Sequence, residues 1–412
     1  MDSSVYFAEA ARVLCGIMIA SILIQTLMAL RYVWALLRFR RPHGDASYCP
    51  KAFVILCVKG RDARMEDTLR SLFQQDYPDY DVRVIVDSRN DPGWDLVHAV
   101  AAETGAKNVY IEALTHRRST CVRKISALLQ GLKGLDPSHK AILMLDSDAR
   151  PHATWIRELV APLADPKVGA ASGNRWYMPD TPSWGGLACY AWNAAAVVQM
   201  YLYRITWGGS LAINREVFEE VGMFDRWPTS FGDDTALCQM LIAHGYDVVY
   251  VPTVPMVNRS VYDMAGLLNF VERQLLCVRM ENPWWKAVVA HGLSTSALIG
   301  AALVTILTGV LAQEWAAAIY AAVGLGVYML GCGLLIAMLE CAIRPVIKHR
   351  GDETRWLSFT TVLKLTLAVP LAQAVHLVGL LCAIFTTTHN WRNVIYRLGG
   401  SPRVSVIGDK AA

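Results

Sequence analysis

The sequence is poor in charge and lacks the short motifs that mark several common classes of protein. Only 18% of its 412 residues are charged and the net charge is +4, whereas an average soluble domain is about 25% charged. So small a net charge gives no electrostatic reason to expect nucleic-acid binding. The ten cysteines form no Cys-x-x-Cys pair, and no Gly-x-x-x-x-Gly-Lys-Ser/Thr loop occurs. A zinc ribbon, a disulfide framework and a P-loop nucleotidase are therefore excluded, and the scattered cysteines suit a reducing compartment.

What the sequence has in excess is hydrophobic residues, which make up 54% of the chain and gather in long uncharged runs. The first run, Val13–Leu30, is long enough to cross a bilayer and has no cleavage site after it, so residues 1–40 are predicted to be a permanent signal anchor. Arginines follow it without an acidic residue among them: Arg31, Arg38, Arg40 and Arg41. The positive-inside rule then places the next part of the chain in the cytosol.

Three further runs lie in a predicted C-terminal membrane region, residues 287–385. Ala287–Leu311 and Trp315–Leu339 are separated by only three residues and predict a helical hairpin whose ends both return to the cytosol. The basic loop after the hairpin includes Arg355, in agreement with that orientation. Leu365–Phe385 predicts either a further span or a re-entrant or interfacial element. Residues 386–412 form a basic tail that ends near Lys410 and argues against the span.

Between residues 50 and 280 the pattern is that of an α/β module. Short apolar runs alternate with helical patterns, and the runs are Ala52–Val58, Val82–Val86, Val109–Ile111 and Ala141–Leu145. Continuous apolar strands of this kind indicate a mostly parallel sheet that is buried on both faces. Ligands of such sheets bind beyond the carboxyl ends of the strands.

Acidic residues gather where these strands are expected to end. They are Asp87, Asp91, Asp146, Asp148, Asp233 and Asp234. Any one of them could be a turn or helix-cap residue, but three clusters together favour a site. Asp146-Ser147-Asp148 suits a hard divalent cation, and the adjacent Asp233-Asp234 suits a general base because one carboxylate raises the pKa of the other. The uncharged run Trp184–Tyr203 is then predicted to be a buried or interfacial helix, since a span there would separate these clusters.

Lys124 lies upstream of the Asp-x-Asp in a cationic run. Its position predicts that the Lys124 ammonium group supplies a positive point charge to a diphosphate. The alternative is that Lys124 lies on a solvated face of a helix.

Several motifs in this order resemble those of known enzymes. They are Asp76-Tyr77-Pro78, Asn90-Asp91-Pro92, Lys124-Ile125, Asp146-Ser147-Asp148, Gly232-Asp233-Asp234, and Trp391-Arg392 with Tyr396-Arg397-Leu398. The chain resembles the membrane-embedded family 2 glycosyltransferases with a GT-A fold, and among them the ceramide glucosyltransferases of family 21 and their bacterial relatives. The expected fold class is therefore a GT-A α/β domain with a mostly parallel sheet, plus transmembrane helices.

The resemblance implies an inverting hexosyltransferase that moves a sugar from a nucleotide sugar, UDP-glucose or similar, to a hydroxyl of a membrane lipid, ceramide-like or other. It implies that Asp87 or Asp91 holds the nucleoside, and that Asp148 with Asp146 holds Mg²⁺ or Mn²⁺. It also implies that Asp234 is the base, with Asp233 the next candidate. The catalytic domain would face the cytosol, at a bacterial inner membrane rather than the Golgi.

The chain departs from the family at the Gln/Arg-x-x-Arg-Trp motif. Arg273 fits the first position as a substrate-binding residue, but Leu276-Cys277 stand where Arg-Trp is expected. Arg279 and Trp284-Trp285 could serve nearby, and the tryptophans could equally form a membrane-interface belt. Two alternative functions remain: a processive polysaccharide synthase, for which so few spans make a poor channel, and an inactive nucleotide-binding membrane protein.

Overall fold

The fold is described from a computed structural model, which covers residues 3–38, 44–45, 47–354 and 358–409. Four basic residues used to orient the chain lie outside these ranges: Arg40, Arg41, Arg355 and Lys410.

A seven-stranded sheet forms the centre of the α/β module, with strand order β3-β2-β1-β4-β6-β5-β7. The strands are β1 (Ala52–Val58), β2 (Tyr80–Val86), β3 (Val109–Ala113), β4 (Ala141–Asp146), β5 (Val168–Tyr177), β6 (Ser210–Asn214) and β7 (Asp247–Asn258). The first four are mutually parallel, β6 is antiparallel to both of its neighbours, and β7 is parallel to β5. The predicted fold class, a mostly parallel GT-A sheet with membrane helices, is confirmed.

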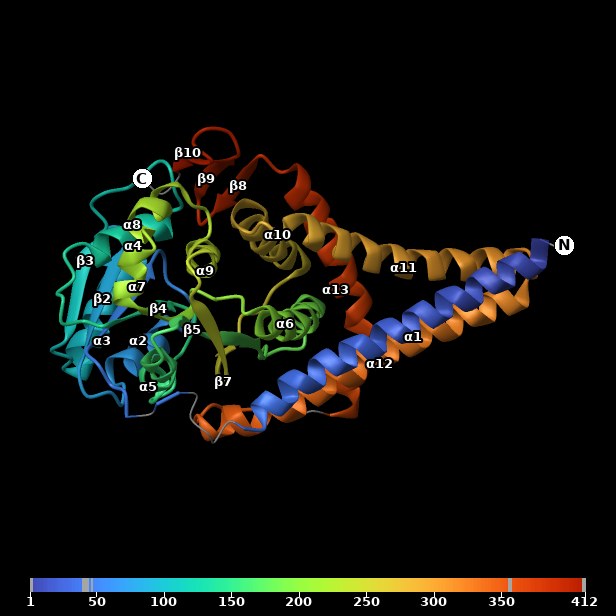
Figure 1. The fold of residues 1–412 in the computed structure, drawn as a ribbon, viewed down its shortest axis with the longest axis horizontal. Helices are drawn as coiled ribbons and strands as arrows, with labels where there is room; N and C mark the ends of the chain where they lie inside the picture. Colours follow the sequence, from blue (N-terminus) through green and yellow to red (C-terminus); the bar gives the residue numbers. More distant parts are fainter. Residues whose placement is uncertain (1–2, 39–43, 46, 355–357, 410–412) are drawn as a thin grey trace.

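Helices cover both faces of this sheet (Figure 1). They are α2 (Met65–Phe73), α3 (Pro92–Thr104), α4 (Arg123–Leu132), α5 (Trp155–Val160), α7 (Arg215–Glu220), α8 (Met223–Arg226) and α9 (Asp233–Ala243), with the 3₁₀ turns η1 (Ala161–Ala164) and η2 (Trp227–Thr229). Alternate residues of β1 enter different cores: Phe53 and Ile55 pack with α4, and Val54 and Leu56 with α2 and α3. Gly131 lets α4 approach the sheet, since a Cβ there would lie 2.3 Å from Ile55 Cδ1.

Four of the described helices are long and apolar enough to cross a membrane. They are α1 (Ser3–Leu36), α11 (Trp285–Leu311), α12 (Trp315–His349) and α13 (Phe359–Phe385). In Figure 1, α1, α11 and α12 extend together away from the sheet, with α1 packed along α12 and a short turn joining α11 to α12. The predicted anchor and helical hairpin therefore exist as helices.

α13 differs from the other three because it stays against the α/β module. It packs on α10 (Met264–Glu281) and on α6 (Trp184–Tyr203), which in turn contacts β5. α13 is one continuous helix through Pro370. The apolar segment Trp184–Tyr203 is a largely buried helix, as predicted.

The C-terminal tail is more ordered than its composition suggests. It forms an antiparallel sheet of β8 (Thr388–Trp391), β9 (Val394–Leu398) and β10 (Val404–Asp409). This small sheet rests on the α/β module, where the backbone N–H of Val406 donates to Ser119 O at 2.8 Å. The sequence pattern predicted only a basic tail.

Candidate active site

One cavity of about 1510 Å³ opens at the carboxyl ends of β1, β2 and β4. The predicted site residues that line it are Asp87, Lys124, Asp146, Asp148, Asp233, Asp234 and Arg273. Strand β4 ends at Asp146, and the N-termini of α4 and α9 supply Lys124 and the Asp233-Asp234 pair. Residues far apart in the sequence therefore meet at one edge of the sheet, as the strand-end argument predicted.

Asp91 is the predicted site residue that does not line this cavity. Its Oδ1 accepts from the backbone N–H of Gly93 at 2.8 Å and its Oδ2 from that of Gly60 at 2.8 Å. Asp91 is thus the N-cap of α3, followed by Pro92 at the first helical position. The structure gives Asp91 a capping role, and of the two residues only Asp87 lines the cavity.

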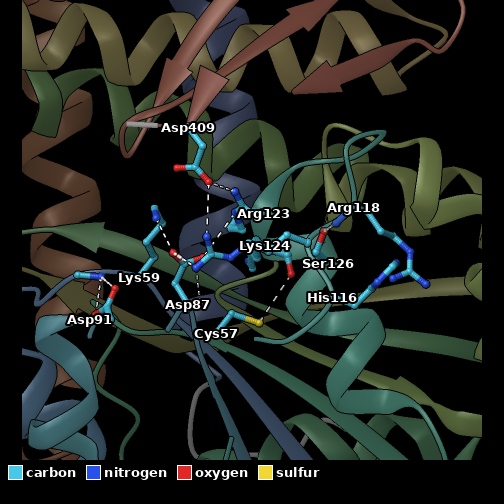
Figure 2. A network of polar contacts seen from close by, with 12 residues as sticks. Cys57, Lys59, Asp87, Asp91, His116, Arg118, Arg123, Lys124, Ser126 and Asp409 are labelled. Carbon is cyan, nitrogen blue, oxygen red and sulfur yellow. Dashed lines mark hydrogen bonds and ion pairs between the residues drawn. The ribbon is translucent and has the colours of Figure 1, made fainter. Parts of the chain in front are cut away.

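Asp87 lies at the centre of a charged network that Figure 2 shows. Its Oδ2 is 2.7 Å from Lys59 Nζ and 3.6 Å from Arg117 Nη2, and its Oδ1 is 3.5 Å from Arg123 Nε. Both arginines also pair with Asp409 of β10. The carboxylate is buried, and among the described residues its Oδ1 has no hydrogen-bond partner.

This network contains residues that the sequence argument missed. Arg117 and Arg123 belong to the cationic run that contains Lys124, and Arg123 is buried. No local pattern indicates that Asp409, near the end of the chain, lies beside the second strand.

Lys124 is the cation shared by two acidic clusters. Its Nζ lies 2.8 Å from Asp146 Oδ1 and 3.0 Å from Asp233 Oδ2. A second cation, Arg175 of β5, lies 3.2 Å from Asp146 Oδ2. Burial disfavours the ionised form of Asp146, but Lys124 and Arg175 outweigh it and lower the pKa of Asp146 to about 2.

The adjacent carboxylates of α9 have different surroundings. Asp234 Oδ2 accepts from the backbone N–H of Gly208 at 2.8 Å, and its Oδ1 accepts from that of Thr235 at 2.6 Å. Asp233 is more deeply buried; burial, together with Asp234 and Asp146, raises the pKa of Asp233 to about 6 although Lys124 opposes the shift. Backbone amide donors therefore fix the orientation of the Asp234 side chain.

The Asp-x-Asp pair offers carboxylate oxygens to a divalent cation. Asp148 Oδ2 accepts from Asn258 Nδ2 at 3.1 Å, and its Oδ1 is 4.0 Å from the nearest Arg175 nitrogen. No group of three or more His, Cys, Asp or Glu side chains suited to a metal occurs in the described part of the chain. Mg²⁺ at phosphate-transfer sites commonly takes one or two carboxylates and completes its shell with phosphate oxygens and water. The residues present fit a cation of that kind, for which Asp148 is the more available ligand.

Sequence comparison assigns the chain to a family: a family model described as Glycosyl transferase family 21 matches residues 13–404. The chain belongs to glycosyl transferase family 21. No curated protein matches it.

Two solved structures are similar to this family 21 chain. A mannosyltransferase from Pyrobaculum calidifontis, solved with GDP-Man and Mn²⁺, is 17% identical, and the match covers 91% of this chain and 99% of that one at a TM-score of 0.47. Glucosyl-3-phosphoglycerate synthase from Mycobacterium tuberculosis, solved with Mn²⁺, UDP and glucosyl-3-phosphoglycerate, is 16% identical over 58% of this chain and 83% of that one, at a TM-score of 0.36.

The family 21 chain differs from the family pattern in α10, and the structure shows how. Leu276 is fully buried in the core. Cys277 lines the cavity but offers no positive charge to a ligand there. Arg279 turns away: its Nη1 donates to Ala383 O at 2.5 Å and to Thr386 O at 2.8 Å, at the end of α13. The suggestion that Arg279 serves the site is therefore wrong.

Arg273, by contrast, lines the cavity, and its guanidinium lies 4.7 Å from the ring centroid of Trp391. Trp284 lines the cavity too, with 72% of its surface exposed.

The far part of the cavity is apolar. Its walls are helix faces of α1, α6, α11, α12 and α13, with Met28, Ala194, Val198, Val288, Leu335 and Val369 among the lining residues. The charged strand ends and the apolar helices thus border one continuous space.

Proposed function

We propose that this family 21 glycosyltransferase is a metal-dependent, inverting hexosyltransferase that moves a sugar from a UDP-linked donor to a hydroxyl of a membrane lipid, ceramide-like or other. Residues 50–280 form the catalytic GT-A domain on the cytosolic side, residues 1–40 its anchor, residues 287–385 the C-terminal membrane region, and residues 386–412 its tail. The scattered cysteines suit a catalytic domain in the reducing cytosol, and the host membrane in this proposal is a bacterial inner membrane.

The continuous cavity carries this proposal. A nucleotide sugar needs charged partners for its diphosphate, and these gather at the sheet end of the cavity. A lipid acceptor needs apolar walls beside the reacting centre, and helices long enough for the membrane line the other end. A soluble acceptor would have no use for such walls.

The nucleoside end is proposed at Asp87. Its buried Oδ1, which lacks a hydrogen-bond partner among the described residues, can accept from an N–H of a nucleobase. The cations Lys59, Arg117 and Arg123 surround that carboxylate and fix its position.

Asp234 is the proposed base. It accepts the proton of the acceptor hydroxyl while the hydroxyl oxygen attacks the anomeric carbon, and the bond from that carbon to the diphosphate oxygen breaks. A single displacement of this kind inverts the anomeric centre. The amides of Gly208 and Thr235 fix the orientation of the Asp234 carboxylate during the transfer.

Asp148, with Asp146, would hold Mg²⁺ or Mn²⁺. The cation, when bound, neutralises charge on the departing diphosphate. Lys124 adds a fixed positive charge beside the same carboxylates.

The test uses the purified full-length chain in lipid nanodiscs with radiolabelled UDP-sugars, tried one at a time, and membrane lipid extract. We expect a labelled lipid carrying one sugar or very few, loss of product in EDTA, and recovery with Mn²⁺ or Mg²⁺. Label in a high-molecular-weight polymer would instead support the polysaccharide synthase. UDP binding without product from any lipid would support the inactive binding protein, and full activity in EDTA would contradict the metal assignment.

A further inference from the structure

Arg175 of β5 is a largely buried cation in the cavity and has no role in the proposed mechanism. Its Nη2 lies 3.2 Å from Asp146 Oδ2 and 4.0 Å from Asp148 Oδ1, and its Nη1 donates to the Tyr177 hydroxyl at 2.9 Å. Only 12% of the side chain is exposed, and its Nε has no hydrogen-bond partner among the described residues. A guanidinium has five N–H donors, so several remain for a ligand.

An aromatic ring holds this guanidinium in place. Its central carbon lies 4.7 Å from the ring centroid of Trp207 and 5.9 Å from that of Phe270. Cation–π stacking orients an arginine without using its in-plane donors. Arg175 is therefore fixed beside the Asp-x-Asp pair with donors to spare.

The segment Trp207-Gly208-Gly209 is shaped for this contact. A Cβ on Gly209 would lie 2.2 Å from the Trp207 ring and 2.5 Å from Asp146 Oδ2. A side chain at position 209 would therefore displace the Trp207 ring or the Asp146 carboxylate. Since Gly208 N–H also binds Asp234, one short segment positions both the proposed base and the stacked arginine.

The charge balance shows what Arg175 can bind. Asp146 and Asp148 would repel a diphosphate, and Lys124 is already shared by two carboxylates. The family's Arg-Trp dipeptide is replaced in α10 by Leu276 and Cys277, which offer no cation. Arg175 and Trp207 bring an arginine and a tryptophan together in the same cavity from two other elements.

We propose that Arg175, stacked on Trp207 beside Asp146 and Asp148, binds the diphosphate of the donor and takes the place of the Arg-Trp dipeptide missing from α10. When the bond between the anomeric carbon and the diphosphate oxygen breaks, the electron pair remains on that oxygen, and Arg175 stabilises the added charge by N–H donation. The proposal rests on the proposed function, because it requires a nucleoside diphosphate as leaving group.

The experiment measures binding of UDP and of uridine by calorimetry to the full-length chain in EDTA, so that no added metal contributes. Arg175→Gln is expected to weaken UDP binding about 10- to 100-fold and to leave uridine binding unchanged, since charge-assisted hydrogen bonds of this strength are lost only at the diphosphate. The matched control is Arg83→Gln on β2. Arg83 also stacks on an aromatic ring, 5.2 Å from the centroid of Phe53, but it does not line the cavity.

Arg175→Lys is a second variant that tests the same role if Arg175→Gln does not fold. It keeps a charge beside Asp146 but loses the planar donors, and we expect UDP binding about 3- to 10-fold weaker than wild type with uridine binding unchanged. UDP affinity equal to wild type in either folded variant, or equal losses for UDP and uridine, would overturn the role of Arg175. If the wild-type chain binds UDP only with Mn²⁺ present, the same variants are compared in Mn²⁺ with the same expected losses. If it binds no UDP either in EDTA or with Mn²⁺, the UDP-linked proposed function itself fails, which is a different result.

Discussion

At the scale of single residues, the pairing of the carboxylates with the cations at the polar end of the cavity decides what each can do. Lys124 and Arg175 both engage Asp146, whereas Asp234 is held by backbone amides. The pKa of Asp146 is consequently lowered to about 2, whereas Asp234 forms no ion pair with a described residue. A base must carry a proton away, so the carboxylate without an ion pair suits that role.

Asp234→Asn is expected to lower the transfer rate by about 10²- to 10⁴-fold, because the amide cannot accept the acceptor's proton. Binding of UDP should stay close to wild type, since Asp234 is not the diphosphate partner. Single-turnover assays with UDP-sugar and lipid, paired with calorimetry, would measure both. Asp225→Asn, at an exposed position of α8, is the control. Near-normal turnover in Asp234→Asn would reassign the base to Asp233.

The raised pKa of Asp233 predicts opposite effects of pH on activity and on stability. Below about pH 6 Asp233 becomes protonated and its ion pair with Lys124 is lost, so kcat/KM should fall as the pH decreases through 6. The folded chain holds this proton at a higher pH than an unfolded one, whose Asp titrates near 4. Protonation therefore favours the folded state, and this group's contribution to stability decreases as the pH rises from about 4 to 6.

Activity and thermal melting measured from pH 5 to 8 would check this, with Asp233→Asn as the comparison. In Asp233→Asn, kcat/KM should no longer fall as the pH decreases through 6. A wild-type profile that is flat between pH 5 and 7 would contradict the assignment.

At the scale of elements, the sequence predicted the strands and helices that are marked by a continuous run of apolar residues. The apolar strands β1, β2 and β4 and the membrane hairpin are continuous runs, and their structure follows from composition alone. The carboxylates at the strand ends could be brought together because parallel strands share one edge. Asp91 was ambiguous, since a cap and a ligand have the same sequence pattern.

The tail sheet could not be predicted in this way. β8, β9 and β10 have 4, 5 and 6 residues and mix polar with apolar side chains, so no period is established. Their position depends on distant contacts, such as the Tyr396 hydroxyl, which accepts from the backbone N–H of Arg123 at 3.1 Å. Arg175 was missed for the same reason, because only the folded sheet brings it beside Asp146.

The contact of Tyr396 with the start of α4 gives a test of the tail's role. Tyr396→Phe removes the acceptor of a buried N–H, which is expected to lower the free energy of unfolding by about 1–3 kcal/mol. UDP binding should weaken as well, since Tyr396 and Arg123 both line the cavity. Tyr110→Phe on β3 makes the same chemical change at an exposed position and should have no effect. Equal denaturation curves for both variants would show that the tail does not support the site.

At the scale of the whole molecule, the surroundings of α13 decide which side of the membrane the tail occupies. Ahead of α13, Asp352 pairs with Arg150 at 3.0 Å and Glu353 O accepts from Arg259. After α13, the Thr386 hydroxyl donates to Glu272 of α10 at 2.9 Å. The segments at both ends of the helix therefore contact the same α/β module and the helix packed on it.

Length alone does not place α13, because 27 residues extend about 40 Å at 1.5 Å per residue and the hydrocarbon core is about 30 Å thick. The contacts favour the interfacial alternative, since a polar domain on one side of a bilayer cannot contact segments on both sides. Reporters inserted near Gly134, near Gly351 and after Gly400 should thus all be cytosolic, whereas one at Gln313, in the turn between α11 and α12, should be external. A fourth span would give the Gly400 reporter the same external signal as Gln313. Thiol labelling of cysteines introduced at the same four positions in intact cells would separate the two arrangements without a fusion.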